Sequence, residues 1–451
     1  MKKNKYEIDM CNGSIMDKLI SFALPLMLSG ILQLMFNAVD LVVVGHFSGQ
    51  EALAAVGSTT ALIAVFTNLF IGVSLGANVL AARFYAAGRE KEMSETVHTS
   101  IMLALISGVA MAIVGVIFAK GALQLMDTPD NVIDLSTLYM RIYFMGMPFF
   151  MLYNYGAAIL RAVGDTKRPL LFLIVSGVSN AILNMILVIV FNLGVAGVAI
   201  GTVMSQLMSC VLVLRCLCKT QSSYQLHFDR LAIKGDYVKL IFQVGIPAGI
   251  QSTVINFSNV LLQSSVNSFG ATAMAGYTAA NNLLGFLYVS VNAVTQACMS
   301  FTSQNYGVGK YKRMDRVLLD CLGLTVVVAG VLGGGVYLFG PQILRIYTSE
   351  ADVISCGMEI LSITTIPYFL CGIMDLFPGS LRGMGYSAVP MVLSVIGTVG
   401  TRILWIYGFF PYNRTLFFLF ISYPGSWLIT IVMQVICYLY VRKRCVGVQK
   451  V

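Results

Sequence analysis

The sequence predicts an all-α polytopic membrane protein built from two similar halves. Three observations indicate this. Of the 451 residues, 57% are hydrophobic and only 11% are charged, apolar stretches recur along the whole chain, and the chain resembles itself at a nearly constant spacing. A water-soluble protein cannot bury that share of apolar side chains, so lipid must be the solvent.

The apolar stretches are each about 20 residues or longer, enough to cross a hydrocarbon core of roughly 30 Å. We expect twelve transmembrane helices, at residues 15–46, 52–82, 95–120, 131–158, 168–191, 194–217, 237–266, 272–304, 316–340, 351–380, 387–410 and 413–441. Helices of close to 30 residues should tilt or reach into the headgroups. No soluble domain is left over.

Basic residues gather in alternate loops. One set of loops holds most of them: Lys2, Lys3, Lys5, Lys18, Arg83, Arg89, Lys91, Arg161, Lys167, Arg168, Arg215, Lys219, Arg230, Lys234, Lys239, Lys310, Lys312, Arg313, Arg316, Arg382, Arg442, Lys443 and Arg444. The opposite loops hold only Lys120, Arg345 and Arg414. Because cytoplasmic loops carry the excess of Lys and Arg, both termini are predicted to be cytoplasmic. Topology thus explains the net charge of +9, and no nucleic-acid partner is expected.

The internal similarity has an offset of 221 to 222 residues. Pro25 matches Pro247 and Phe47 matches Phe269, while Pro169 matches Pro390. Each half has an even number of crossings, so the halves are parallel six-helix repeats with a substrate site expected between them. We therefore predict an N-terminal lobe at 1–218, a cytoplasmic linker at 219–236 and a C-terminal lobe at 237–451.

Asp40 is an acid within the first predicted helix, about 10 Å from its outer end at helical rise. Asn180 and Asn184 are one turn apart on the fifth helix, and a turn near Leu193 brings Thr202 of the sixth helix to the depth of Asn184. Such oxygens suit a hard monovalent cation. The alternatives are a carboxylate that caps or snorkels near the surface, and amides that hydrogen-bond helices together.

Two more charges fall inside predicted helices. Asp375, in the tenth helix, either binds a cation or pairs with a base such as Arg402. Arg402, in the eleventh, is either a structural partner or a charge in the substrate cavity. Together they form a possible second polar site.

Several motifs resemble those of the multidrug and toxic-compound extrusion (MATE) transporters over nearly the whole chain. They are the run 40–45 after Pro25, the run 160–166 before Pro169, the run 381–385 before Pro390, and the stretches 194–197 and 201–206. The resemblance implies a V-shaped bundle of twelve helices that exports cationic amphipathic compounds in exchange for Na⁺ or H⁺.

The resemblance also implies a cation-coupling site in the N-terminal lobe, which maps onto Asp40, Asn180, Asn184 and Thr202. Asn184 departs from the family, which commonly has a carboxylate there. A single carboxylate balances a single monovalent charge, so Asp40 can hold Na⁺ or a proton. Pro25 is the expected bending point of the first helix.

The function predicted from these features is antiport of organic molecules at a bacterial cytoplasmic (inner) membrane, by a monomer with no cofactor beyond the coupling ion. One alternative is a flippase for lipid-linked precursors, which should have a larger cationic cavity than Arg402 and Arg141 suggest. An integral-membrane enzyme would need clustered acids or histidines. His46, His98 and His227 are far apart in the chain, so we expect no enzyme.

Overall fold

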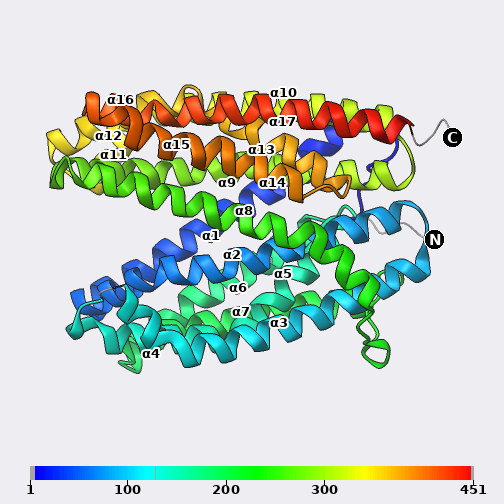
Figure 1. Ribbon diagram of the computed structural model, residues 1–451. Coiled ribbons are helices and arrows are strands. Elements are labelled where there is room, and N and C mark those ends of the chain that lie inside the picture. Colours follow the sequence, from blue (N-terminus) through cyan, green and yellow to red (C-terminus); the bar gives the residue numbers. More distant parts are fainter. Residues whose placement is uncertain (1–5, 127, 448–451) are drawn as a thin grey trace. The chain divides into compact units, whose positions relative to one another are not determined.

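The computed structural model describes residues 6–126 and 128–447, and all regular secondary structure within these ranges is helical. Lys2, Lys3 and Lys5, which contributed to the predicted orientation, lie outside the described residues, as do the outermost ends of the predicted lobes. The chain forms two compact units, each a bundle of long helices (Figure 1). Unit 1 comprises Met1–Asp9 and Leu28–Gly249, and unit 2 comprises Met10–Met27 and Ile250–Val451.

The helices of the first half are α1 (Met16–Phe47), α2 (Gln50–Ala86), α3 (Glu90–Leu125), α4 (Asp130–Met145), α5 (Met147–Ala162), α6 (Lys167–Met185), the π-helical η1 (Ile186–Val190), α7 (Gly194–Lys219) and the short η2 (Phe228–Arg230). Those of the second half are α8 (Gly235–Asn267), α9 (Ala271–Gly307), α10 (Tyr311–Leu338), α11 (Gly340–Tyr347), α12 (Ala351–Thr365), α13 (Tyr368–Gly383), α14 (Ala388–Ser394), η3 (Val395–Gly400), α15 (Thr401–Leu404), η4 (Trp405–Phe409), η5 (Phe410–Tyr412), α16 (Leu416–Phe420) and α17 (Ser422–Gly447).

Ten stretches of helix in the described part of the chain are long and apolar enough to cross a membrane, against twelve predicted. An eleventh span is the pair α12 and α13, which bends by 47°. Pro367 lies at this break, where its ring and missing N–H end the helix. The remaining predicted span, 131–158, falls on α4 and α5, which meet at Gly146 just before Pro148.

The boundary between the two units does not follow the boundary between the two repeats. Helix α1 begins in unit 2 and enters unit 1 at Leu28, three residues after Pro25. Helix α8 begins in unit 1 and enters unit 2 at Ile250, three residues after Pro247. The two repeat-related prolines therefore mark the points at which α1 and α8 change from one compact unit to the other.

Candidate functional site

Four residues that the sequence predicts to converge lie together in unit 1, and we call this cluster the Asp40 cage. Asn184 Nδ2 of α6 donates to Asp40 Oδ1 of α1 at 2.6 Å and lies 3.4 Å from Asn180 Oδ1. Asn180 Nδ2 in turn donates to Thr202 Oγ1 of α7 at 3.4 Å. A carboxylate, two amides and a hydroxyl thus meet at the junction of three helices.

The local sequence explains why α6 and α7 bring these groups together. The chain reverses between the helices at Asn192 and Gly194, which both adopt a φ of 52° in the left-handed region. Gly201 then allows α7 to approach closely, because a Cβ at that position would collide with Asn184 Oδ1. The tight turn after α6 and the absence of a side chain at Gly201 together set the distance between the amides of α6 and the hydroxyl of Thr202 on α7.

The Asp40 cage contains an acceptor oxygen that has no donor. Asn184 is fully buried and Asn180 is 5% exposed, while Asp40 and Thr202 are half-buried. Asn184 Oδ1 has no hydrogen-bond partner in the described structure. A buried polar atom left in this way costs about 1–3 kcal/mol. A cation beside it would remove that cost, so the observed oxygens fit a small hard cation.

The hydroxyl of Thr202 is oriented to accept rather than to donate within the Asp40 cage. Its proton is used outside the cage, because Oγ1 donates to the carbonyl oxygen of Val198 at 2.9 Å. On the side of the cage, Oγ1 accepts from Asn180 Nδ2. The geometry of all four residues therefore agrees with the predicted convergence, while their role in ion coupling stays a prediction.

The two other predicted charges, Asp375 and Arg402, lie in unit 2 and do not pair with each other. Asp375 is half-buried in α13 and has no hydrogen bond or ion pair within the described ranges. Arg402 of α15 instead donates from Nη1 to Asn259 Oδ1 at 2.9 Å. Of the two alternatives for Asp375, the pair with Arg402 is therefore absent, and cation binding by Asp375 stays a prediction.

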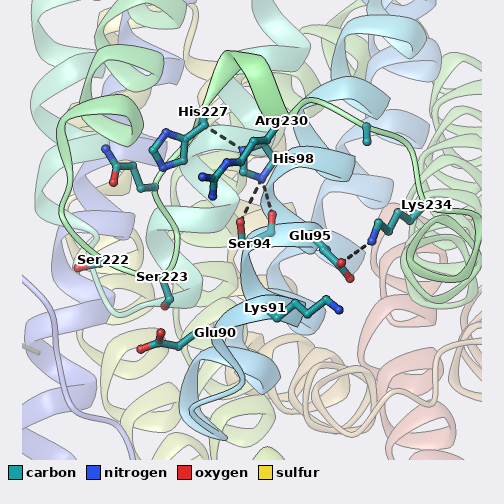
Figure 2. A pocket seen from close by; sticks show the side chains of 12 residues that line it. Glu90, Lys91, Ser94, Glu95, His98, Ser222, Ser223, His227, Arg230 and Lys234 are labelled. Carbon is teal, nitrogen blue, oxygen red and sulfur yellow. Dashed lines mark hydrogen bonds and ion pairs between the residues drawn. The ribbon is translucent and has the colours of Figure 1, made fainter.

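A polar pocket that the sequence did not indicate lies between the start of α3 and the segment 222–234 (Figure 2). Its volume is about 510 Å³. The rings of His98 and His227 stack here with centroids 6.3 Å apart, although 129 residues separate them in the chain. Glu95 of α3 pairs with Lys234 at the edge of the pocket. No local signal in the sequence joins positions so distant, because the linker carries His227 back onto α3.

The MatE family model matches the chain twice, at residues 25–186 and 247–407. The chain belongs to the MATE family. The two matches start at Pro25 and Pro247 and are offset by 222 residues at their starts and by 221 at their ends (247 − 25 and 407 − 186). The internal repeat predicted from the sequence is therefore confirmed, and this MATE protein is a multi-pass member of a family of multidrug efflux transporters.

Relatives support the same family. The probable multidrug resistance protein YoeA of Bacillus subtilis (strain 168) is 29% identical over 433 residues, which cover 94% of this chain and 93% of YoeA. The probable multidrug resistance protein YpnP of the same organism is 27% identical over 388 residues, 86% of this chain and 87% of YpnP. An outward-facing MATE multidrug resistance transporter of the MOP superfamily superimposes with a TM-score of 0.89 at 20% identity, covering both chains fully.

Proposed function

We propose that this MATE transporter is a secondary active antiporter that exports organic molecules, chiefly cationic amphipathic ones, in exchange for Na⁺ or H⁺. The coupling ion enters from outside and is captured in the Asp40 cage. The observation that carries this proposal is the buried, unpartnered Asn184 Oδ1 beside the Asp40 carboxylate. The transporter works as a monomer in the cytoplasmic membrane.

The helix that carries Asp40 offers a route by which the ion acts on the whole transporter. Asp40 lies on α1, whose first part packs in unit 2 and whose later part packs in unit 1. An ion that draws Asp40 towards the amides of α6 pulls on a helix that both units share. Pro25 lies three residues before α1 changes unit, so bending there would carry the effect of the ion along α1.

Exchange requires that drug and ion exclude one another. Suppose that the transporter switches between its inward and outward openings only when it carries an ion or a drug molecule, and not when it is empty. The inward flow of ions then drives the outward flow of the drug. The ion must then bind one arrangement of unit 1 better than the other, because a ligand shifts an equilibrium only by its differential affinity.

The test uses everted vesicles, a fluorescent organic cation, and Na⁺ and H⁺ gradients imposed separately. We expect one of the two gradients to drive uptake of the organic cation, and Asp40→Asn to abolish that uptake while the protein remains folded in the membrane. Asp134→Asn is the matched control, because Asp134 forms only an exposed surface pair with Lys120. Uptake by Asp40→Asn at the native rate would reject the proposal.

Transfer of a lipid-linked precursor, without movement of the organic cation, would instead indicate a flippase.

A further inference from the structure

The repeat assigns counterparts in the second half to Asp40, Asn180 and Thr202 of the Asp40 cage. In the first helix of each half the offset is 222, as Pro25 with Pro247 and Phe47 with Phe269 require. Asp40 therefore corresponds to Leu262, which is completely buried. Where unit 1 has its carboxylate, unit 2 has an aliphatic side chain.

The counterpart of Arg402 in the first half follows from the offset at this point of the repeat. Pro169 and Pro390 set an offset of 221 at the start of α6 and α14. The two family-model matches end at residues 186 and 407, which is the same offset. Arg402 therefore corresponds to Ala181, next to Asn180 on α6, and Asn180 corresponds to Thr401.

Arg402 lies at the same three-helix junction in unit 2 as Asn180 does in unit 1. It donates to Asn259 Oδ1 at 2.9 Å and to Ser258 Oγ at 3.4 Å on α8, the counterpart of α1. Its Nε donates to Ser426 Oγ of α17 at 3.4 Å. Its guanidinium carbon lies 4.1 Å from the centroid of Tyr423. Tyr423 is the counterpart of Thr202, because Asn192 and Asn413 keep the offset of 221 before α7 and α17.

The surroundings of Arg402 are those of a bound cation. The residue is 3% exposed, and no carboxylate in the described parts of the chain lies within ion-pair distance of it. A guanidinium stays charged in a protein, and burying a charge is costly unless it is compensated. The compensation consists of an amide oxygen, two hydroxyl oxygens and the face of an aromatic ring, which are all groups that attract cations.

We propose that the junction of α8, α15 and α17 is a second cation-binding cage, permanently occupied by the chain's own guanidinium. The Asp40 cage exchanges its ion, whereas the equivalent cage of unit 2 holds a tethered one. Unit 2 thereby stays in its cation-loaded arrangement throughout the cycle. If the side chain of Arg402 is removed, the cage should accept a small planar organic cation from solution.

The first test is Arg402→Ala in purified, detergent-solubilised protein, with thermal unfolding as the readout. Guanidinium chloride at millimolar concentrations should raise the unfolding midpoint of this variant by several degrees, because a ligand that binds only the folded state stabilises it. Urea has nearly the same shape and no charge, so it should have no such effect. Sodium chloride controls for ionic strength. The native protein, whose cage is filled, should respond to none of them at these concentrations.

Equal responses to guanidinium and urea, or equal responses of the variant and the native protein to guanidinium, would overturn the proposal. Because the readout is stability, it is independent of whether the protein is an antiporter. If Arg402→Ala does not fold, Arg402→Lys and Arg402→Met provide the test. Lys keeps the charge and should give a folded protein that unfolds near the native midpoint, while Met, of similar length, should unfold well below it. A Met variant as stable as the Lys variant would contradict the assignment.

Discussion

At the residue scale, Thr202 contributes one oxygen to the Asp40 cage, and this contribution can be measured. Thr202→Val keeps the shape of the side chain and removes Oγ1. We expect the ion concentration for half-maximal efflux to rise about tenfold, equivalent to ~1.4 kcal/mol of binding free energy. The maximal rate should change little, because Asp40 still supplies the charge. The measurement is drug uptake into everted vesicles as a function of the driving ion.

Ser205→Ala is the control for Thr202→Val. Ser205 lies nearly one turn further along α7, and its hydroxyl donates to the backbone carbonyl oxygen of Thr202 at 2.7 Å. Its removal takes a hydroxyl from the same helix without taking an oxygen from the Asp40 cage. If both variants shift the ion dependence equally, Thr202 is acting through the stability of α7 rather than as a ligand.

His98 holds the linker segment to α3 through both of its ring nitrogens. Nδ1 lies 2.6 Å from the carbonyl oxygen of Ser94, which can only accept, so Nδ1 carries the proton. Nε2 lies 3.1 Å from the backbone nitrogen of His227, which can only donate, so Nε2 must present its lone pair.

Because His98 Nε2 accepts the backbone N–H of His227, His98→Ala should release the segment around His227. We expect faster amide hydrogen exchange of residue 227 in His98→Ala than in the native protein at the same pH. His98→Gln should exchange at nearly the native rate, because an amide oxygen can accept the N–H. His227→Ala is the control and should also exchange at nearly the native rate after correction for the intrinsic exchange rate, since it retains the backbone donor. Native exchange in His98→Ala would contradict the assignment.

Three members of the Asp40 cage could be predicted together because they are constrained locally, whereas Asp40, 144 residues from Asn184, was assigned to it by its depth in the first helix and by the resemblance to MATE transporters. Asn180 and Asn184 are one helical turn apart, and the short turn after α6 fixes the depth of Thr202 relative to Asn184. The contact of His98 with His227 could not be predicted, because it depends on how a linker without regular periodicity folds back. Arg402 was recognised as a buried charge, but its partners on α8 and α17 depend on helix packing that no sequence pattern specifies.

At the scale of elements, Gly201 determines how closely α6 and α7 approach. A Cβ there would collide with Asn184 Oδ1, so Gly201→Ala should separate the helices and open the Asp40 cage. We expect efflux to fall at least tenfold in everted vesicles, together with a lower thermal unfolding midpoint. Gly121→Ala in α3 is the control, because a Cβ at Gly121 meets no atom within 4 Å. Normal efflux by Gly201→Ala would show that the spacing of α6 and α7 is not critical.

Pro25 and Pro247 occupy equivalent positions in α1 and α8, just before each helix changes unit. A proline inside a helix removes a backbone hydrogen bond and permits bending. Pro25→Ala and Pro247→Ala should therefore stiffen these helices and lower the maximal efflux rate several-fold, with little change in drug affinity. Pro129→Ala, at the N-cap of α4 outside any helix interior, should transport normally. Equal rates in all three variants would exclude bending at the two prolines as a rate-determining feature.

The element boundaries were predictable where apolar runs end at polar loops, as at the turn between α6 and α7. They were not predictable where a helix is interrupted within an apolar run. The break at Pro367 could have been read from the proline itself, whereas the π-helical η3 depends on hydrogen-bond register, which composition does not encode.

At the scale of the whole molecule, the contacts within each unit agree with one part of the predicted orientation, namely that these segments share a side of the membrane. In unit 1, Glu7 accepts hydrogen bonds from Tyr85 at 2.8 Å and from Tyr224 at 2.7 Å. The N-terminal segment, the end of α2 and the linker therefore meet at one end of that unit. In unit 2, Asp315 near the start of α10 pairs with Arg442 near the end of α17 at 2.8 Å. All of these segments are predicted to be cytoplasmic.

Reporter fusions test this orientation directly. A fusion that ends after Gln221 in the linker should give fluorescent green fluorescent protein and inactive alkaline phosphatase, because both reporters would then lie in the cytoplasm. A fusion that ends after Asn192, between η1 and α7, should give the opposite result, since one further crossing separates the two points. The prediction is specific because Asn192 and Gln221 are joined by a single helix, α7. Phosphatase activity of the fusion at Gln221 would show that the topology is the reverse of the predicted one. The Asp40 cage would then lie at the wrong depth to receive an ion from outside.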